Sequence, residues 1–225
     1  MNREHLLSVA ALCVLTTLIL PGCDYRTASP LRVPVRGYLY SDEAEPAGFG
    51  AYGYLLFTAQ PSGNDLPRYQ HVCEAFQRDL VEAWGNAPED RTSQMATFWP
   101  LQIPQATAPK FFDCQNLVKN YDYRRASGIA TAIKKQGARG PILTASAKPI
   151  AEANSSGALV LDLSDFADED LDRAFAIWRE RISTDPAAWR DGFNLVVCRE
   201  AFRNFLQKYG DTVLAIVNPA KESKK

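Results

Sequence analysis

The feature that most constrains this chain is an alternation of short apolar runs with longer amphipathic segments. Residues 158–163 (ALVLDL) form a nearly continuous apolar run, which is typical of a strand covered on both faces. From Leu171 to Ile182, apolar residues recur at the three- and four-residue spacing of an amphipathic helix. Because this alternation runs along the chain, we expect an α/β fold: a layered domain with a mixed, mostly buried sheet flanked by amphipathic helices.

The same patterns divide the rest of the chain into elements. Strands are expected at 33–40, 52–59, 95–103, 141–145, 158–163 and 212–217, and helices at 66–84, 114–121, 123–137, 171–182 and 186–210. Asp113 and Asp122 are expected helix caps, and Gly137 is the expected end of the third helix. Since the first strand contains Pro34, we expect the first two strands to form an edge or a small hairpin.

The charge balance argues against nucleic-acid binding. The chain has 225 residues, 25 Lys and Arg against 26 Asp and Glu, and a net charge of -1. It has only two histidines, His5 and His71, which argues against a multi-histidine metal site. His71 is expected on the surface of a helix, without a catalytic role.

The charges are distributed unevenly along the chain. Residues 123–151 contain no acid, whereas residues 162–185 are strongly acidic. The candidate basic face consists of Arg124, Arg125, Lys134, Lys135 and Arg139. Such a face would suit anionic lipid headgroups or an acidic partner. The alternatives are solvated helix faces, or pairing of the basic and acidic segments with each other.

The first 23 residues have the pattern of an export signal. Arg3 precedes the uncharged run 6–20, which is too short to span a membrane. The run ends in Leu20-Pro21-Gly22-Cys23, which resembles the signal of bacterial lipoproteins. The resemblance implies cleavage after Gly22, diacylglycerol on the sulfur of Cys23 and acylation of the new amino terminus. The alternatives are an ordinary signal peptide or an uncleaved anchor.

This resemblance sets the expected domain organisation and location. Residues 1–22 would be the signal peptide, 23–32 a lipidated tether, 33–218 a single α/β domain and 219–225 a disordered tail. The protein would be anchored by lipid in the cell membrane or the outer membrane, facing the periplasm. The tether would span ~30 Å at most, so the domain should lie close to the bilayer.

Three cysteines remain in the exported chain: Cys73, Cys114 and Cys198. An oxidising compartment permits a disulfide. We expect Cys73 and Cys114 to pair, because both lie near the starts of helices that could lie in parallel on one face of the sheet. Cys198 is expected to be a buried thiol within a helix. The alternative is three separate buried thiols.

Two motifs could carry chemistry. Asp162 and Asp165 follow a buried strand, where ligands of α/β sheets bind, and are candidates for a divalent-cation site. The alternative is a turn at the strand end followed by a helix cap. Gly48, Gly50 and Gly53 have the spacing of a dinucleotide-binding loop, but a strand follows them instead of a helix. We therefore interpret these glycines as a flexible turn.

The sequence favours a non-catalytic binding or assembly module of the cell envelope. It would be attached to the membrane by lipid, would contact another envelope protein and would need no cofactor. The alternative is an envelope hydrolase or transferase that uses carboxylates, with a divalent cation near Asp162 and Asp165.

Overall fold

The computed structural model describes residues 34–82, 91–92, 94–135, 137–150, 157–182, 188, 192–207, 209–210 and 213–217. The expected signal peptide (1–22), Cys23 and the tether (23–32) lie outside these residues. So do the expected helix start at Pro186 and the tail (219–225).

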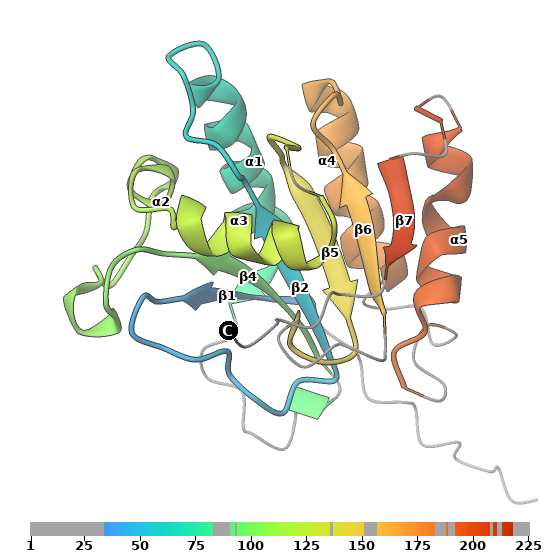
Figure 1. Cartoon of the computed structure of the whole chain (residues 1–225), viewed down its shortest axis with the longest axis horizontal. Helices are drawn as coiled ribbons and strands as arrows, with labels where there is room; N and C mark the ends of the chain where they lie inside the picture. The colour runs from blue at the N-terminus through green and yellow to red at the C-terminus, as the bar shows by residue number, and fades with distance from the viewer. Residues whose placement is uncertain are drawn as a thin grey trace, which may run out of the picture.

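A single mixed sheet of seven strands organises the described residues (Figure 1). The strands are β1 (Pro34–Leu39), β2 (Ala51–Leu56), β3 (Val81–Glu82), β4 (Met95–Pro100), β5 (Ile142–Ser146), β6 (Ala158–Asp162) and β7 (Leu214–Val217). Their order is β3-β1-β4-β2-β5-β6-β7. The first four in this order are parallel, and β5, β6 and β7 are each antiparallel to the preceding neighbour. The predicted mixed α/β sheet is therefore confirmed.

The expected arrangement of the first two strands is wrong. β1 and β2 are not a hairpin, because β4 lies between them and is parallel to both. Nor is β1 the edge, since the two residues of β3 pair with Val35 and Arg36. Pro34 is nevertheless tolerated, because it is the first residue of its strand.

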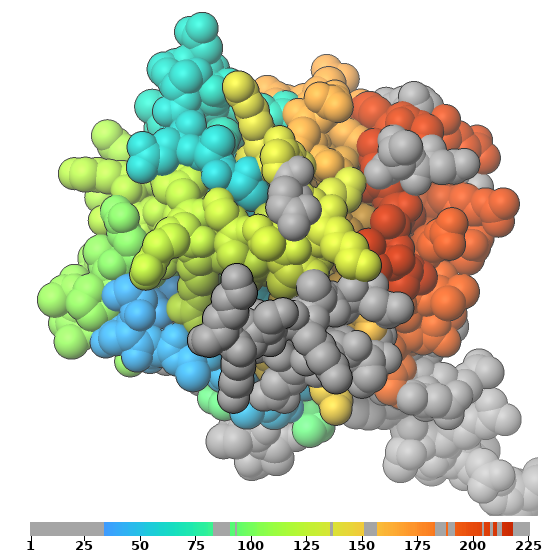
Figure 2. Space-filling model, viewed as in Figure 1, coloured from blue at the N-terminus to red at the C-terminus, as the bar shows by residue number. Residues whose placement is uncertain are grey.

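Helices cover the sheet on two sides. They are α1 (Leu66–Asp79), α2 (Cys114–Lys119), α3 (Tyr123–Ala132), α4 (Asp168–Ile177) and α5 (Leu195–Leu206), with the short 3-10 helix η2 (Gln105–Thr107) and the π-helix η4 (Trp178–Ile182). In Figure 1, α3 crosses the near face of the sheet, and α1 and α4 lie behind it. Figure 2 shows the side chains of α3 covering the strands beneath them. α5 packs on β6, β7 and η4.

Side-chain caps set the starts of three helices. The carboxylate of Asp113 accepts from the amide of Asn116, and that of Asp122 accepts from the amide of Arg125. Asn194 caps α5 in the same way. Each cap satisfies an amide that has no partner within the first turn of its helix.

The ends of two helices differ from expectation. α3 ends at Ala132, and the left-handed residue that closes it is Lys134, at φ 59°, three residues before the expected Gly137. The amides of Lys134 and Lys135 donate to the carbonyls of Thr131 and Ala130, which is the Schellman pattern. α1 ends at Asp79, before the predicted Trp84, because the extended Leu80 leads directly into β3.

Gly53 has a packing role that the turn interpretation missed. It lies inside β2, where an added Cβ would come 2.8 Å from Thr97 Oγ1 and 3.1 Å from the carbonyl oxygen of Thr144. The indole of Trp178 donates to the same Thr97 hydroxyl at 3.2 Å. Only glycine fits beside this buried pair, which ties the π-helix to the sheet.

An aromatic cluster forms the core at the carboxyl ends of β2 and β4. The ring centroid of Trp99 lies 5.3 Å from that of Tyr121, 5.4 Å from Phe76 and 5.8 Å from Phe57. The Trp99 indole also donates to the carbonyl of Leu117 at 3.3 Å. This cluster joins two strands to α1, α2 and α3, so it fixes the helices around that end of the sheet.

Candidate functional site

Two cavities lie on either side of the loop 57–65 that follows β2. This loop begins at the carboxyl end of a strand that is parallel to β4, the position where α/β sheets bind ligands. We call the cavities the glutamine pocket, of about 370 Å³, and the charged cleft, of about 650 Å³. Both volumes are in the range of small-molecule sites, and Gln60 contributes to both cavities.

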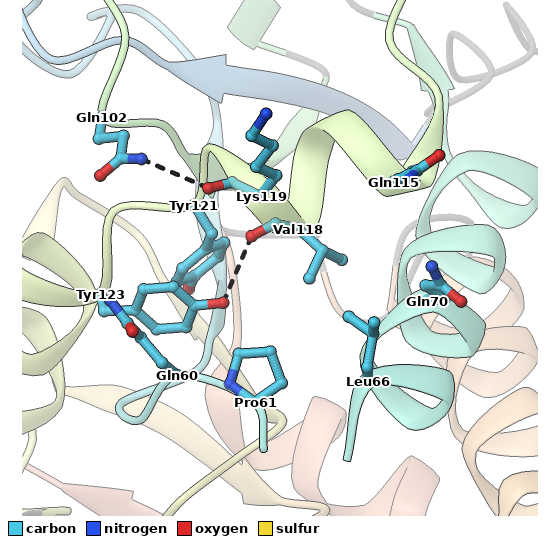
Figure 3. A pocket seen from close by; sticks show the side chains of 10 residues that line it. All are labelled: Gln60, Pro61, Leu66, Gln70, Gln102, Gln115, Val118, Lys119, Tyr121 and Tyr123. Atoms are coloured by element: carbon cyan, nitrogen blue, oxygen red, sulfur yellow. Dashed lines mark hydrogen bonds between the residues drawn. The ribbon is translucent and has the colours of Figure 1, made fainter. Parts of the chain in front are cut away.

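The glutamine pocket is assembled from the β2–α1 loop, α1, the segment after β4, α2 and the start of α3. Its lining residues are Gln60, Pro61, Leu66, Gln70, Gln102, Gln115, Val118, Lys119, Tyr121 and Tyr123. Figure 3 shows the Tyr123 hydroxyl, Pro61, Leu66 and Val118 around the centre. The pocket thus has an apolar centre with carboxamides around it.

The floor of the glutamine pocket is held by Tyr121. Its hydroxyl accepts from the amide of Phe57 at 2.9 Å and donates to the carbonyl of Leu55 at 2.8 Å. Burial raises the pKa of the Tyr121 phenol well above its usual value, and burial also raises that of Tyr123. Both phenols therefore stay protonated at neutral pH, which suits hydrogen bonding and not general-base chemistry.

The walls of the glutamine pocket are joined by a disulfide. Cys73 in α1 is bonded to Cys114 in α2, with 5.6 Å between their Cα atoms, so the structure contains the expected pair. The position of Cys73 differs from expectation, because it lies in the middle of α1 and not near its start. Gln77 adds a second link between these segments, donating to the carbonyl of Phe112 at 2.9 Å. Cys198 is a buried thiol in α5, as expected.

Most of the polar groups around the glutamine pocket have unused hydrogen-bonding capacity. Gln102 donates to the carbonyl of Lys119 at 3.3 Å. Within the described part of the chain, the side-chain amides of Gln60, Gln70 and Gln115 form no hydrogen bond, and the Lys119 ammonium forms no ion pair. These groups can therefore bind a ligand without breaking an internal contact.

The charged cleft is different, because its charges mostly stabilise the fold. Arg68 donates to the carbonyls of Leu163, Ser164 and Phe166 at 2.8, 3.1 and 2.6 Å. Asp65 accepts from the Ser62 hydroxyl at 2.6 Å, and that contact lowers the pKa of its carboxyl. The cleft is consequently the less suitable of the two cavities for binding a ligand.

The candidate metal ligands both line the charged cleft, but Asp162 is already engaged. One carboxylate oxygen of Asp162 accepts from the amide and hydroxyl of Ser164, and the other lies 3.3 Å from Lys135 Nζ. Asp165 is exposed. Across the described ranges, no group of three or more His, Cys, Asp or Glu side chains is placed to hold a metal. These contacts match the turn of the structural alternative, but the helix cap expected with it is wrong, because α4 has Ala167 at its N-cap and no side-chain cap.

The five residues of the candidate basic face fall into two groups, those that make contacts within the fold and those that are exposed. Arg125 donates to the carbonyls of Tyr40 and Glu43 at 3.0 and 3.2 Å, and Lys135 pairs with Asp162. Arg124, Lys134 and Arg139 are exposed, with Arg139 on the charged cleft. Two of the five predicted residues therefore serve the fold.

The acidic segment pairs chiefly with α1. Arg78 Nη2 lies 2.8 Å from Asp172 Oδ1, and Arg68 lies 3.5 Å from Asp168. His71 Nε2 is 3.3 Å from Asp172, and its side chain is 28% exposed. Lys135–Asp162 is the one ion pair between the basic and acidic segments that the described residues show. The alternative of mutual pairing is therefore confirmed at this one contact.

Known proteins offer no guide to this site. Comparisons with protein-family models, with curated proteins and with solved structures find no significant match to the chain. In the ranges described, no helix has both the length and the apolar character needed to cross a membrane.

The sequence did not indicate the glutamine pocket. Gln60, Gln70, Gln102 and Gln115 come from four separate segments, so they form no motif. A signal existed only in the Cys73–Cys114 pairing, which implied that two of those segments are neighbours.

Proposed function

We propose that this protein is a lipid-anchored component of the bacterial cell envelope that acts as a non-catalytic binding module. The sequence 20–23 supports the anchor by its resemblance to lipoprotein signals. The Cys73–Cys114 disulfide supports export to an oxidising compartment. The domain would face the periplasm close to its membrane and contact another envelope component.

The glutamine pocket is the single observation that carries the binding role. A disulfide and an aromatic cluster hold its walls, so little ordering is needed when a ligand binds. Three carboxamides on its rim have no internal partner among the described residues. These carboxamides are therefore available to a ligand.

The contacts of Asp162 weigh against the hydrolase alternative. A catalytic or metal-binding carboxylate needs an oxygen that is available to substrate or metal. Both oxygens of Asp162 are instead used by Ser164 and Lys135. This observation supports a binding role over the hydrolase alternative at Asp162.

The anchor is tested by metabolic labelling with palmitate in cells that express the full chain. The wild type should take up label and sediment with membranes. Cys23→Ser should lose the label and leave the membrane fraction, whereas the control Cys198→Ser should behave as the wild type. Label that survives in Cys23→Ser would overturn the anchor.

The binding role is tested by photo-cross-linking in the same cells. The photoreactive p-benzoylphenylalanine is placed at Gln115, on the pocket rim, or at Gln105, an exposed control outside the pocket. We expect a recurrent adduct with an envelope component from position 115 alone. Absence of an adduct at 115, or the same adducts from both positions, would contradict the proposed function.

A further inference from the structure

We propose that the glutamine pocket binds an N-acetylated amino sugar. This inference rests on the proposed function and names the ligand class of the same site.

The centre of the pocket is apolar but open to solvent. Pro61, Leu66 and Val118 surround it, and Leu66 remains 40% exposed (Figure 3). A small apolar group that covers this leucine would gain hydrophobic stabilisation. The methyl of an acetamido group and the C–H face of a sugar ring both fit this requirement.

The rim of the pocket complements amides and hydroxyls. The carboxamides of Gln60, Gln70 and Gln115 each offer donors and an acceptor, and the hydroxyl of Tyr123 makes only a long 3.4 Å contact to the carbonyl of Val118. An acetamido group presents one N–H and one C=O, and the sugar hydroxyls present both functions. A ligand of this kind can satisfy the rim while its methyl lies at the apolar centre.

The charge of the lining excludes other common ligand classes. Among the described residues that line the pocket, Lys119 alone is charged, so a nucleotide or a multiply charged phosphate would lack counter-charges there. An added peptide strand would need an unpaired strand edge, but β2 and β4 are each paired on both sides. A neutral or singly anionic saccharide is consistent with both facts.

The experiment measures the binding of two disaccharides, N,N′-diacetylchitobiose and cellobiose, to the full lipidated chain. The protein is kept in a detergent that has no sugar headgroup. Cellobiose has the same backbone linkage but lacks the acetamido groups. We expect saturable binding of diacetylchitobiose that is about tenfold tighter than that of cellobiose, the value of one or two hydrogen bonds. Gln70→Ala and Gln115→Ala should each weaken it about tenfold, and Gln105→Ala should leave it unchanged.

A second measurement distinguishes two sources of such a sugar, the peptidoglycan of the cell wall and a free saccharide. Purified peptidoglycan sacculi should sediment the wild type but not Gln115→Ala if the source is the wall polymer. Binding of diacetylchitobiose without sedimentation on sacculi would indicate a free saccharide. Either result supports an amino-sugar site.

Three results would each contradict the assignment of an amino sugar as the ligand: no saturation at millimolar disaccharide, equal binding of cellobiose, or unchanged binding in Gln70→Ala and Gln115→Ala. If the disaccharide fails while the probe at position 115 captures an envelope component, only the ligand assignment is wrong. If both fail, the proposed function fails as well.

Discussion

Lys134 occupies a position that favours glycine. Its φ of 59° lies in the left-handed region, where the Cβ of an ordinary residue crowds the following carbonyl. We predict that Lys134→Gly stabilises the protein by about 1 kcal/mol, the strain released less the entropy of glycine. Chemical denaturation measures this change.

The matched control for Lys134→Gly is Gly137→Ala. Gly137 has a φ of +85° and open space around its Cα, so alanine there adds strain without a steric clash. It should destabilise the protein by about 1 kcal/mol. A loss of stability in Lys134→Gly would mean that the lysine side chain makes a stabilising contact that outweighs the backbone strain.

Asp79 is a second residue that should contribute strongly to the free energy of unfolding, because its carboxylate is buried between two arginines. Its side chain is 4% exposed, with Arg179 Nη1 at 2.6 Å and Arg78 Nη2 at 2.8 Å. We predict that Asp79→Ala costs about 2 to 3 kcal/mol in the free energy of unfolding. This value is below that of a fully buried pair, because both arginines are half-exposed and can be hydrated.

The control for Asp79→Ala is Glu180→Ala, which removes an exposed partner of Arg179 at 2.8 Å. Exposed pairs contribute little, so this variant should change stability by about 0.5 kcal/mol or less. Equal effects of the two substitutions would show that burial of Asp79 does not set its contribution.

At the scale of elements, the Cys73–Cys114 disulfide should determine the stability of the pocket walls. It closes a loop with a sequence separation of 41 residues between α1 and α2. The combined substitution Cys73→Ser and Cys114→Ser should cost about 3 to 4 kcal/mol by the loop-entropy relation. Denaturant unfolding measures the cost, and the wild type in reductant should match the double variant. A reduced wild type that is as stable as the oxidised one would contradict the prediction.

Elements with a local signal were predictable, and those without one were not. The strand 158–163 and the caps Asp113 and Asp122 were found because each depends on neighbouring residues. β3 was missed because its two residues are both exposed and have no pattern. The insertion of β4 between β1 and β2 was also missed. β2 and β4 are buried along their whole length, which erases the alternation that could have indicated pairing.

At the scale of the whole molecule, the site itself escaped prediction. The residues that line the glutamine pocket converge only because the aromatic cluster and the disulfide bring distant segments together. Asp162 and Asp165, which the sequence did single out, lie on the neighbouring cleft, where Asp162 completes a turn. The location of the two aspartates after a strand therefore pointed to the correct end of the sheet. It did not identify the residues that are available to a ligand.

Buried tyrosines should make the whole molecule sensitive to alkaline pH. Burial raises the pKa of Tyr40 and of Tyr69 to about 12 and that of Tyr54 well above its usual value. An unfolded tyrosine ionises near pH ~10. Between about pH 10 and 12 the unfolded chain therefore holds fewer protons than the folded protein, and stability falls as pH rises. Below that window the contribution of these tyrosines is fully present.

Tyr69→Phe isolates one of these groups. The Tyr69 hydroxyl donates to the carbonyl of Ala59 at 2.8 Å, so the variant should be less stable than the wild type at neutral pH by about 1 kcal/mol. Because phenylalanine cannot ionise, the wild type should lose about 1 to 2 kcal/mol relative to the variant as pH rises from 10 to 12, so the difference should vanish or reverse in sign. Denaturant midpoints across that range, with the ultraviolet absorbance of tyrosinate recorded in parallel, measure both effects. A difference that stays constant with pH would mean that Tyr69 ionises equally in both states, and the folded packing around α1 would then be looser than the structure describes.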